Sequence, residues 1–123
     1  NRRDNAYKIY KIFSNNSNIR MQRYDSYSSF FGFSLILQNK LINKRKSVIN
    51  FMKKNKIENR PIVTGNILNN PMMRFAKIRK KGKYPNVSFI DQNGIMIGNR
   101  SRPINKKEIE ILKNLNDFLL ESK

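Results

Sequence analysis

The stretch FFGFSLIL, residues 30–37, decides the fold of this chain. Its apolar residues alternate from Phe31 through Phe33 and Leu35 to Leu37, and a period of two predicts a β-strand with one buried face. Gly32 lies on the opposite face, where the lack of a side chain lets a neighbouring backbone come close. The run stops after eight residues, well short of a membrane span. We therefore expect this strand to lie in the core of a folded domain.

Helical patterns flank the strand. Apolar side chains recur at helical spacing in residues 2–15, 41–55 and 104–120. Asn105 and Glu108 are spaced as the capping box that opens a helix. Residues 85–94 begin with Pro and end with Gly, which is typical of a helix start and stop. These segments predict helices that cover a sheet.

Two more short strands complete the expected sheet, RPIVT at residues 60–64 and IMIGN at residues 95–99. Gly65 and Asn66 follow the first of them and suit a turn. A short helix after Pro71 and a basic loop are expected next. The order predicts an α+β domain with three short, mostly antiparallel strands covered by helices, and residues 1–123 form a single domain. Since the first residue is Asn rather than Met, we expect a segment of something longer.

Positive charge dominates the composition. Lys and Arg number 26 against 8 Asp and Glu, a formal net charge of +18. Such an excess favours nucleic acid, an anionic membrane or a phosphate-bearing ligand. The alternative is compositional drift, in which lysines only cover solvent faces. The scattered placement of the charges and the abundance of Asn favour drift, and residues 77–83, KIRKKGK, are the best candidate patch.

The chain has few of the residue types that commonly act in catalysis. The chain has no His and no Cys, which removes thiolate nucleophiles and the usual zinc sites and fits a reducing compartment. None of the eight carboxylates forms an evident inward-facing pair, and no Gly-rich phosphate loop has the required context. The sequence therefore predicts neither a catalytic residue nor a metal site.

The ends of two predicted strands carry candidate binding residues. Arg60 begins one strand, and Gly98 and Asn99 end another, with Arg100 and Arg102 after them. Arg offers a planar fork for phosphate, and Asn offers a donor and an acceptor for sugar hydroxyls. If the ends converge, they suit a phosphorylated sugar. If they do not, they are plain turns with solvated arginines.

An ordered series of motifs resembles the C-terminal part of the DegT/StrS-type sugar aminotransferases. The family's Trp-Phe-Gly-Phe-Pro strand corresponds to residues 30–34, its acid-X-Arg-Pro strand to residues 58–61, and its Gly-Asn turn to residues 65–66, with Pro71 five residues on. NGIMIGN and INKKEI match the last strand and the capped last helix. Ser34 in place of Pro and Phe30 in place of Trp depart from the pattern. The series spans nearly the whole chain.

The resemblance implies the small C-terminal domain of a fold-type-I pyridoxal-phosphate (PLP) enzyme, either an aminotransferase or a 3-dehydratase of nucleotide-linked 4-keto-6-deoxy sugars. Such enzymes are cytoplasmic homodimers that serve nucleotide-sugar and O-antigen biosynthesis. A large domain, absent from this chain, holds PLP and the catalytic Lys, or a His in some dehydratases. By the resemblance, Arg60, Asn66 and Asn99 lie near the nucleotide sugar and anchor it. The domain closes one side of the active site, and we do not expect it to be catalytic alone.

A second hypothesis is a small basic nucleic-acid-binding module. It predicts exposed aromatic side chains interleaved with Arg or Lys on one face. Phe31, Phe33, Phe51 and Phe118 fall on apolar stripes, which favours a role in the core and makes nucleic acid the weaker hypothesis. A third possibility is a remnant that folds without enzymatic activity. Binding to a random oligonucleotide and the sequence encoded upstream discriminate between the three.

Overall fold

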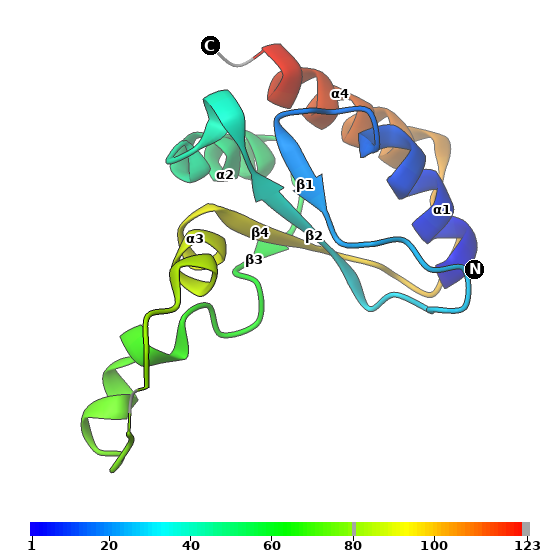
Figure 1. The fold of residues 1–123 in the computed structure, drawn as a ribbon. Helices are drawn as coiled ribbons and strands as arrows, with labels where there is room; N and C mark the ends of the chain where they lie inside the picture. The colour runs from blue at the N-terminus through cyan, green and yellow to red at the C-terminus, as the bar shows by residue number, and fades with distance from the viewer. Residues whose placement is uncertain (80, 122–123) are drawn as a thin grey trace.

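A computed structural model describes residues 1–79 and 81–121, and in these ranges the chain folds into four α-helices and a four-stranded antiparallel sheet. The order of the strands across the sheet is β1-β2-β4-β3. Figure 1 shows the sheet at the centre with helices on both sides. The elements are α1 (Arg2–Phe13), β1 (Ile19–Met21), β2 (Gly32–Leu37), α2 (Arg45–Lys54), β3 (Asn59–Arg60), α3 (Pro85–Asn93), β4 (Gly94–Gly98) and α4 (Lys106–Glu121). The predicted α+β class is confirmed.

The strands differ from the prediction in number and length. β1 was not predicted, because a three-residue strand is too short to show a period of two. β3 is only Asn59–Arg60, so the strand predicted over residues 60–64 is wrong beyond Arg60. Pro61 has no backbone N–H to donate, and Val63 has a φ of 51°, which lies outside the β region. The chain therefore turns away from the sheet after two paired residues.

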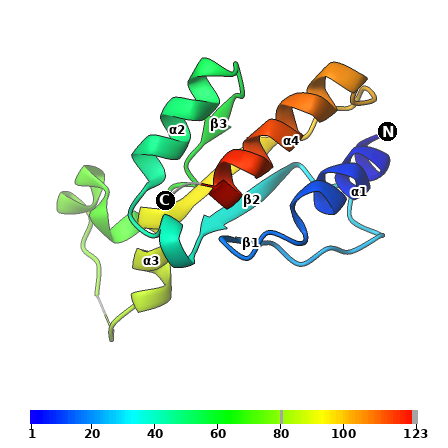
Figure 2. The same ribbon diagram turned by 90° about the horizontal axis from the view of Figure 1, so that it is seen from above.

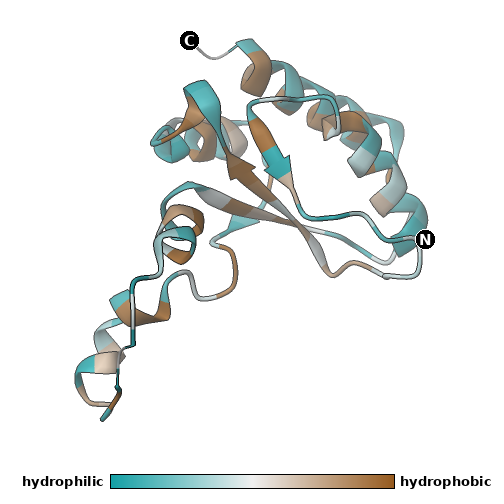
Figure 3. Cartoon of the chain, viewed as in Figure 1, coloured by the Kyte–Doolittle hydropathy of each residue, from teal (hydrophilic) through white to brown (hydrophobic). Residues whose placement is uncertain are grey.

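Helices α1, α2 and α4 cover one side of the sheet and α3 lies on the other, as the two views in Figures 1 and 2 show. The buried hydrophobic side chains of β2 and β4 are Phe33, Leu35, Leu37, Ile95 and Ile97, and Figure 3 shows the hydrophobic colour along β2. Phe51 of α2 stacks on Phe118 of α4 with ring centroids 4.1 Å apart. The predicted core is confirmed at Phe33, Leu35, Leu37, Phe51 and Phe118.

Phe31 does not belong to the core. The alternation in residues 30–37 predicted that it would be buried with Phe33, yet 71% of its surface is exposed. β2 begins only at Gly32, and Phe30, with a φ of 37°, takes the buried place beside Phe33 instead. The rings of Phe30 and Phe33 are stacked at 5.4 Å. The left-handed turn at Phe30 thus displaces its neighbour to the surface.

Residues 61–79 and 81–84 extend away from the sheet, and Figure 1 shows them as an arm below α3. Two short 3-10 helices lie in this arm, η2 (Ile67–Asn69) and η3 (Pro71–Arg74), while a third, η1 (Asn39–Leu41), precedes α2. The helix predicted after Pro71 is confirmed as a 3-10 turn. Within the part of the chain that the structure describes, no helix has the length and apolarity needed to cross a membrane.

Gly32 provides a test of the β2–β4 contact. A Cβ built at this position would lie 2.7 Å from the carbonyl oxygen of Ile97. We expect Gly32→Ala to lower the free energy of unfolding by about 1–3 kcal/mol, because the backbone of β4 has to move. Gly98 faces Gly32 across the sheet, and a Cβ there meets no atom within 4 Å. Gly98→Ala should be neutral or stabilising, by up to about 1 kcal/mol. Urea unfolding of both variants measures the difference, and equal midpoints would contradict the close approach.

Candidate functional site

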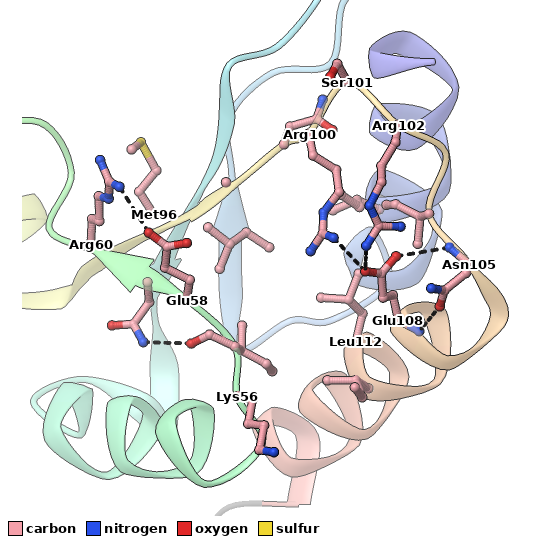
Figure 4. Close-up of a pocket in the computed structure, with 18 of the residues that line it drawn as sticks. Lys56, Glu58, Arg60, Met96, Arg100, Ser101, Arg102, Asn105, Glu108 and Leu112 are labelled. Carbon is pink, nitrogen blue, oxygen red and sulfur yellow. Dashed lines mark hydrogen bonds and ion pairs between the residues drawn. The ribbon is translucent and has the colours of Figure 1, made fainter.

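A cleft of about 870 Å³ opens beside the end of β4. Its walls come from the loop between α2 and β3, from β3 itself, from the loop that joins β4 to α4, and from the first turns of α4. Figure 4 shows Glu58 and Arg60 on one wall and the Arg100–Glu108 cluster on the other. The floor is apolar and includes Ile9, Ile97 and Leu112. The volume falls in the range of small-molecule sites.

The charged lining of the cleft is mostly positive. Two carboxylates line it, those of Glu58 and Glu108, and the cations outnumber them. The cationic side chains are Lys56, Arg60, Arg100, Arg102 and Lys107. Such a lining attracts an anionic ligand and repels a cationic one.

Glu108 is the best-connected side chain of the cleft. Its Oε1 accepts from Arg100 Nη1 and from Arg102 Nη2, each at 2.8 Å, and its Oε2 accepts from the backbone N–H of Asn105 at 3.1 Å. Asn105 Oδ1 in turn accepts from the backbone N–H of Glu108 at 2.9 Å. The predicted capping box is therefore confirmed, and its carboxylate also holds two guanidinium groups.

The environment of Glu108 lowers the pKa of its carboxyl group. The hydrogen bond from the backbone N–H of Asn105 is the largest cause, and the charges of Arg100 and Arg102 act in the same direction. Burial opposes them, because it disfavours the charged form. At neutral pH the group is ionised, so its contacts with both arginines are ion pairs.

Arg60 faces the cleft from the other wall. Its Nη2 lies 3.0 Å from Glu58 Oε1, and both side chains are more than half exposed. An exposed ion pair of this kind contributes little to stability, so an anionic ligand can replace Glu58 as the partner of Arg60. Arg60 therefore retains donors for a ligand.

Asn99 is buried at the end of β4 and has structural contacts. Its Nδ2 donates to the carbonyl oxygens of Arg2 and Phe30, each at 3.0 Å. Its Oδ1 is buried and has no partner among the described residues. These hydrogen bonds fix the point where the chain leaves β4. They connect this end of the cleft to α1 and to the residue before β2.

Asn66 lies away from the cleft. Its Oδ1 accepts from the backbone N–H of Leu68 and caps η2, and its Nδ2 donates to Ser88 Oγ at 3.4 Å. The structure thus brings Arg60 and Asn99 to the cleft and places Asn66 at the base of the arm. The sugar-anchoring role of these three residues stays a prediction.

Asn5 lies behind the cleft and was not indicated by the sequence. Its Nδ2 donates to the carbonyl oxygens of Arg100 and Arg102, at 3.0 and 2.8 Å, and its Oδ1 accepts from the backbone N–H of Ile104 at 3.0 Å. It is fully buried on the apolar face of α1. A polar residue at a helical core position is the signal that could have found it.

The cleft does not by itself fit PLP. PLP enzymes use a lysine for the Schiff base, or a His at that place in some dehydratases, and a partner for the ring nitrogen, usually an acid or an arginine. Lys56 and Lys107 are exposed at the cleft, and the carboxylates of Glu58 and Glu108 already bind arginines. Within residues 1–79 and 81–121, no group of His, Cys, Asp or Glu could hold a metal ion either.

No protein-family model matches the chain. It is 33% identical over 119 residues to GDP-4-keto-6-deoxy-D-mannose 3-dehydratase of Yersinia pseudotuberculosis, a match that covers 96% of this chain and 29% of the relative. A solved 3-dehydratase with a trapped PLP-glutamate geminal diamine has a TM-score of 0.80 at 28% identity, over 98% of this chain and 30% of that one. A mutant of such an enzyme with bound GDP-perosamine has a TM-score of 0.83 at 30% identity, over 94% of this chain and 30% of that one.

These matches support the resemblance that the motif series indicated, since the solved neighbours are PLP enzymes that act on nucleotide-linked sugars. Two curated relatives and the two solved structures described above are GDP-4-keto-6-deoxymannose 3-dehydratases. The chain spans less than a third of the length of the curated relatives that it matches. Its sheet and helices correspond to a small domain of these fold-type-I neighbours.

Glu108 gives a pH-dependent prediction. Because its folded-state pKa is lowered, the stability it contributes is present above the ordinary carboxyl pKa of 4.5 and is lost as the pH falls through the folded value. Glu108→Gln keeps the capping hydrogen bonds but lacks the charge. We expect this variant to be less stable than the parent at neutral pH and equally stable well below pH 4.5.

Urea unfolding at several pH values measures the effect. Glu110→Gln removes the same charge from an exposed position in α4 and serves as the control. Asn105→Ala, which removes the cap itself, should cost about 1 kcal/mol. A parallel pH dependence in the parent and in Glu108→Gln would contradict the ion-pair role.

Proposed function

We propose that residues 1–123 are the C-terminal small domain of a PLP-dependent 3-dehydratase that acts on a GDP-linked 4-keto-6-deoxy sugar. The observation that carries this proposal is the match of 96% of the chain to 29% of a 3-dehydratase, supported by a TM-score of 0.80 to a solved one. The relatives favour dehydration over the amino transfer that the sequence left open. The other part of the enzyme holds PLP and its catalytic residue.

The role of this chain is to bind and orient the nucleotide sugar. The cationic lining of the cleft suits the negative charge of a sugar nucleotide, and Arg60 supplies a fork for it. Asn99 holds the end of β4 in place, and Asn66 does the same for the base of the arm. In this proposal the domain closes one side of an active site, and the full enzyme is a cytoplasmic homodimer.

The reading frame that encodes this chain tests the proposal. We expect it to encode a large domain, with a Lys or a His at the cofactor position, upstream of Asn1. The complete protein, supplied with PLP and glutamate, should convert GDP-4-keto-6-deoxy-D-mannose, as followed by mass spectrometry. A frame without such a domain would exclude this function for the chain.

Arg60 gives a kinetic prediction in that enzyme. We expect Arg60→Gln to raise KM for the nucleotide sugar about tenfold, since a hydrogen bond to a charged group contributes about 1.5 kcal/mol. The change in kcat should be smaller, because anchoring acts in the ground state and the transition state alike. Arg23 is exposed and lies outside the cleft, so Arg23→Gln is the matched control. Unchanged kinetics in Arg60→Gln would remove Arg60 from the site.

A second candidate function, nucleic-acid binding, is favoured by the arm of residues 61–84. Phe75 and Tyr84 are 87% and 44% exposed there. Exposed cations lie near them in the sequence, and the nucleic-acid hypothesis requires such cations beside exposed aromatic side chains. These cations are Arg74, Lys77, Arg79, Lys81 and Lys83. Lys80 of the same run lies outside the described residues.

Salt dependence tests this second candidate. A single-stranded oligonucleotide should bind at low salt, and log K should fall against log salt with a slope of about 0.7 for each phosphate that the arm neutralises. We expect Lys77→Gln/Arg79→Gln to make this slope shallower. Lys53→Gln/Lys113→Gln, the control, removes the same charge from exposed helical positions. Weak binding of the parent chain at low salt would rule the candidate out.

A further inference from the structure

We propose that Arg100 and Arg102 form a binding site for a phosphoryl group, and that this site takes the diphosphate of a ligand in the cleft. The two arginines belong to the loop that joins β4 to α4, and both line the cleft. Their side chains are about half exposed, at 53% and 55%. A ligand can therefore reach them without any movement of the chain.

The two guanidinium groups are held close together. Both donate to the same atom, Glu108 Oε1, at 2.8 Å, so the two donating nitrogens cannot be further apart than twice that distance. Each group uses one of its five N–H donors in this contact. The others are left for a ligand, and Figure 4 shows both side chains directed to the same side of the cleft.

Glu108 is itself immobilised. Its second oxygen accepts from the backbone of Asn105, and its own N–H donates to the Asn105 side chain. The carboxylate is therefore fixed to the first turn of α4 by hydrogen bonds at two points. Holding the arginines in place before a ligand arrives reduces the entropy that binding has to overcome.

The backbone that carries the arginines is fixed as well. The buried side chain of Asn5 binds the carbonyl oxygens of Arg100 and Arg102 and the N–H of Ile104. Asn99, just before the loop, is bound to the carbonyl oxygens of Arg2 and Phe30. Both asparagines are at most 7% exposed. An exposed loop with only solvated arginines would not need two buried side chains to hold its shape.

The chemistry of the pair favours phosphate over carboxylate. A carboxylate has two oxygens and matches one arginine fork. A diphosphate linkage has four non-bridging oxygens on two phosphorus atoms, which can accept from two forks at once. The pair retains a net positive charge after Glu108 is counted, and Lys107 adds to it at the start of α4. A diphosphate therefore gains more at this place than a monoanion.

The identity of the ligand as a sugar nucleotide rests on the proposed function, whereas the phosphoryl site rests on the geometry alone. In that setting Arg60 holds one part of the ligand from the β3 wall and the arginine pair holds the diphosphate from the α4 wall. Pyrophosphate lacks the sugar and the base, so its binding tests the phosphoryl site without testing the proposed function.

The experiment is a titration of the isotope-labelled 123-residue chain with pyrophosphate, followed by NMR. We expect shifts confined to residues 56–60 and 96–108, and at least tenfold weaker binding in Arg100→Gln/Arg102→Gln. Arg20→Gln/Arg23→Gln removes the same charge from exposed positions outside the cleft and should bind like the parent. NMR signals from residues outside the cleft show whether each variant is folded. If the double variant does not fold, Arg100→Gln and Arg102→Gln are tested separately.

The outcomes are distinct. Unchanged binding in the Arg100 and Arg102 variants, or equal weakening in the control, overturns the site, and so does tighter binding of a single-stranded oligonucleotide at the same residues. Arg100→Lys/Arg102→Lys keeps the charge without the forks, so binding equal to that of the parent would overturn the assignment to guanidinium groups. If pyrophosphate binds as expected and the complete protein does not convert GDP-4-keto-6-deoxy-D-mannose, the phosphoryl site stands and the proposed function fails.

Discussion

The antiparallel pairing of β2 with β4 is the contact on which the rest of the structure depends. It joins five residue pairs, from Gly32–Gly98 to Ile36–Gly94, and the two shorter strands are added on either side of it. The helices on the core side pack against alternate residues of both strands. Because successive side chains point to opposite faces, a shift of one residue would expose the core and move the cleft. The close approach at Gly32 helps to fix that register.

The sequence predicted the parts of this fold that have a strong period. Apolar residues alternate within residues 30–37 and recur at helical spacing around Leu112 and Leu115. The spacing of Asn105 and Glu108 alone predicts the capping box of α4. The sheet order was not predictable, and neither was β1, because pairing between distant strands leaves little local signal. The early end of β3 follows from Pro61 and Val63, whose backbone conformations override the apolar run around them.

The candidate site was only partly predictable for a different reason. Arg60 begins a predicted strand, Asn99 and the two arginines after it lie at the end of another, and the topology brings all four to one cleft. Asn66 was selected on the same ground and lies elsewhere, since β3 ends before it. The abundance of Asn suggested drift, yet the structure buries six of these residues as hydrogen-bonding links. A single sequence does not show which asparagines have this role.

The bonds of Asn5 have a consequence for the order of folding. They connect α1 to a loop 95 to 99 residues further along the chain. Contacts at such separation form late, because the entropy of closing a long loop has to be overcome first. The cleft can acquire its final shape only when the first and last helices have come together. Shortening the chain at its beginning would then impair the arginine loop, although that loop lies near the opposite end.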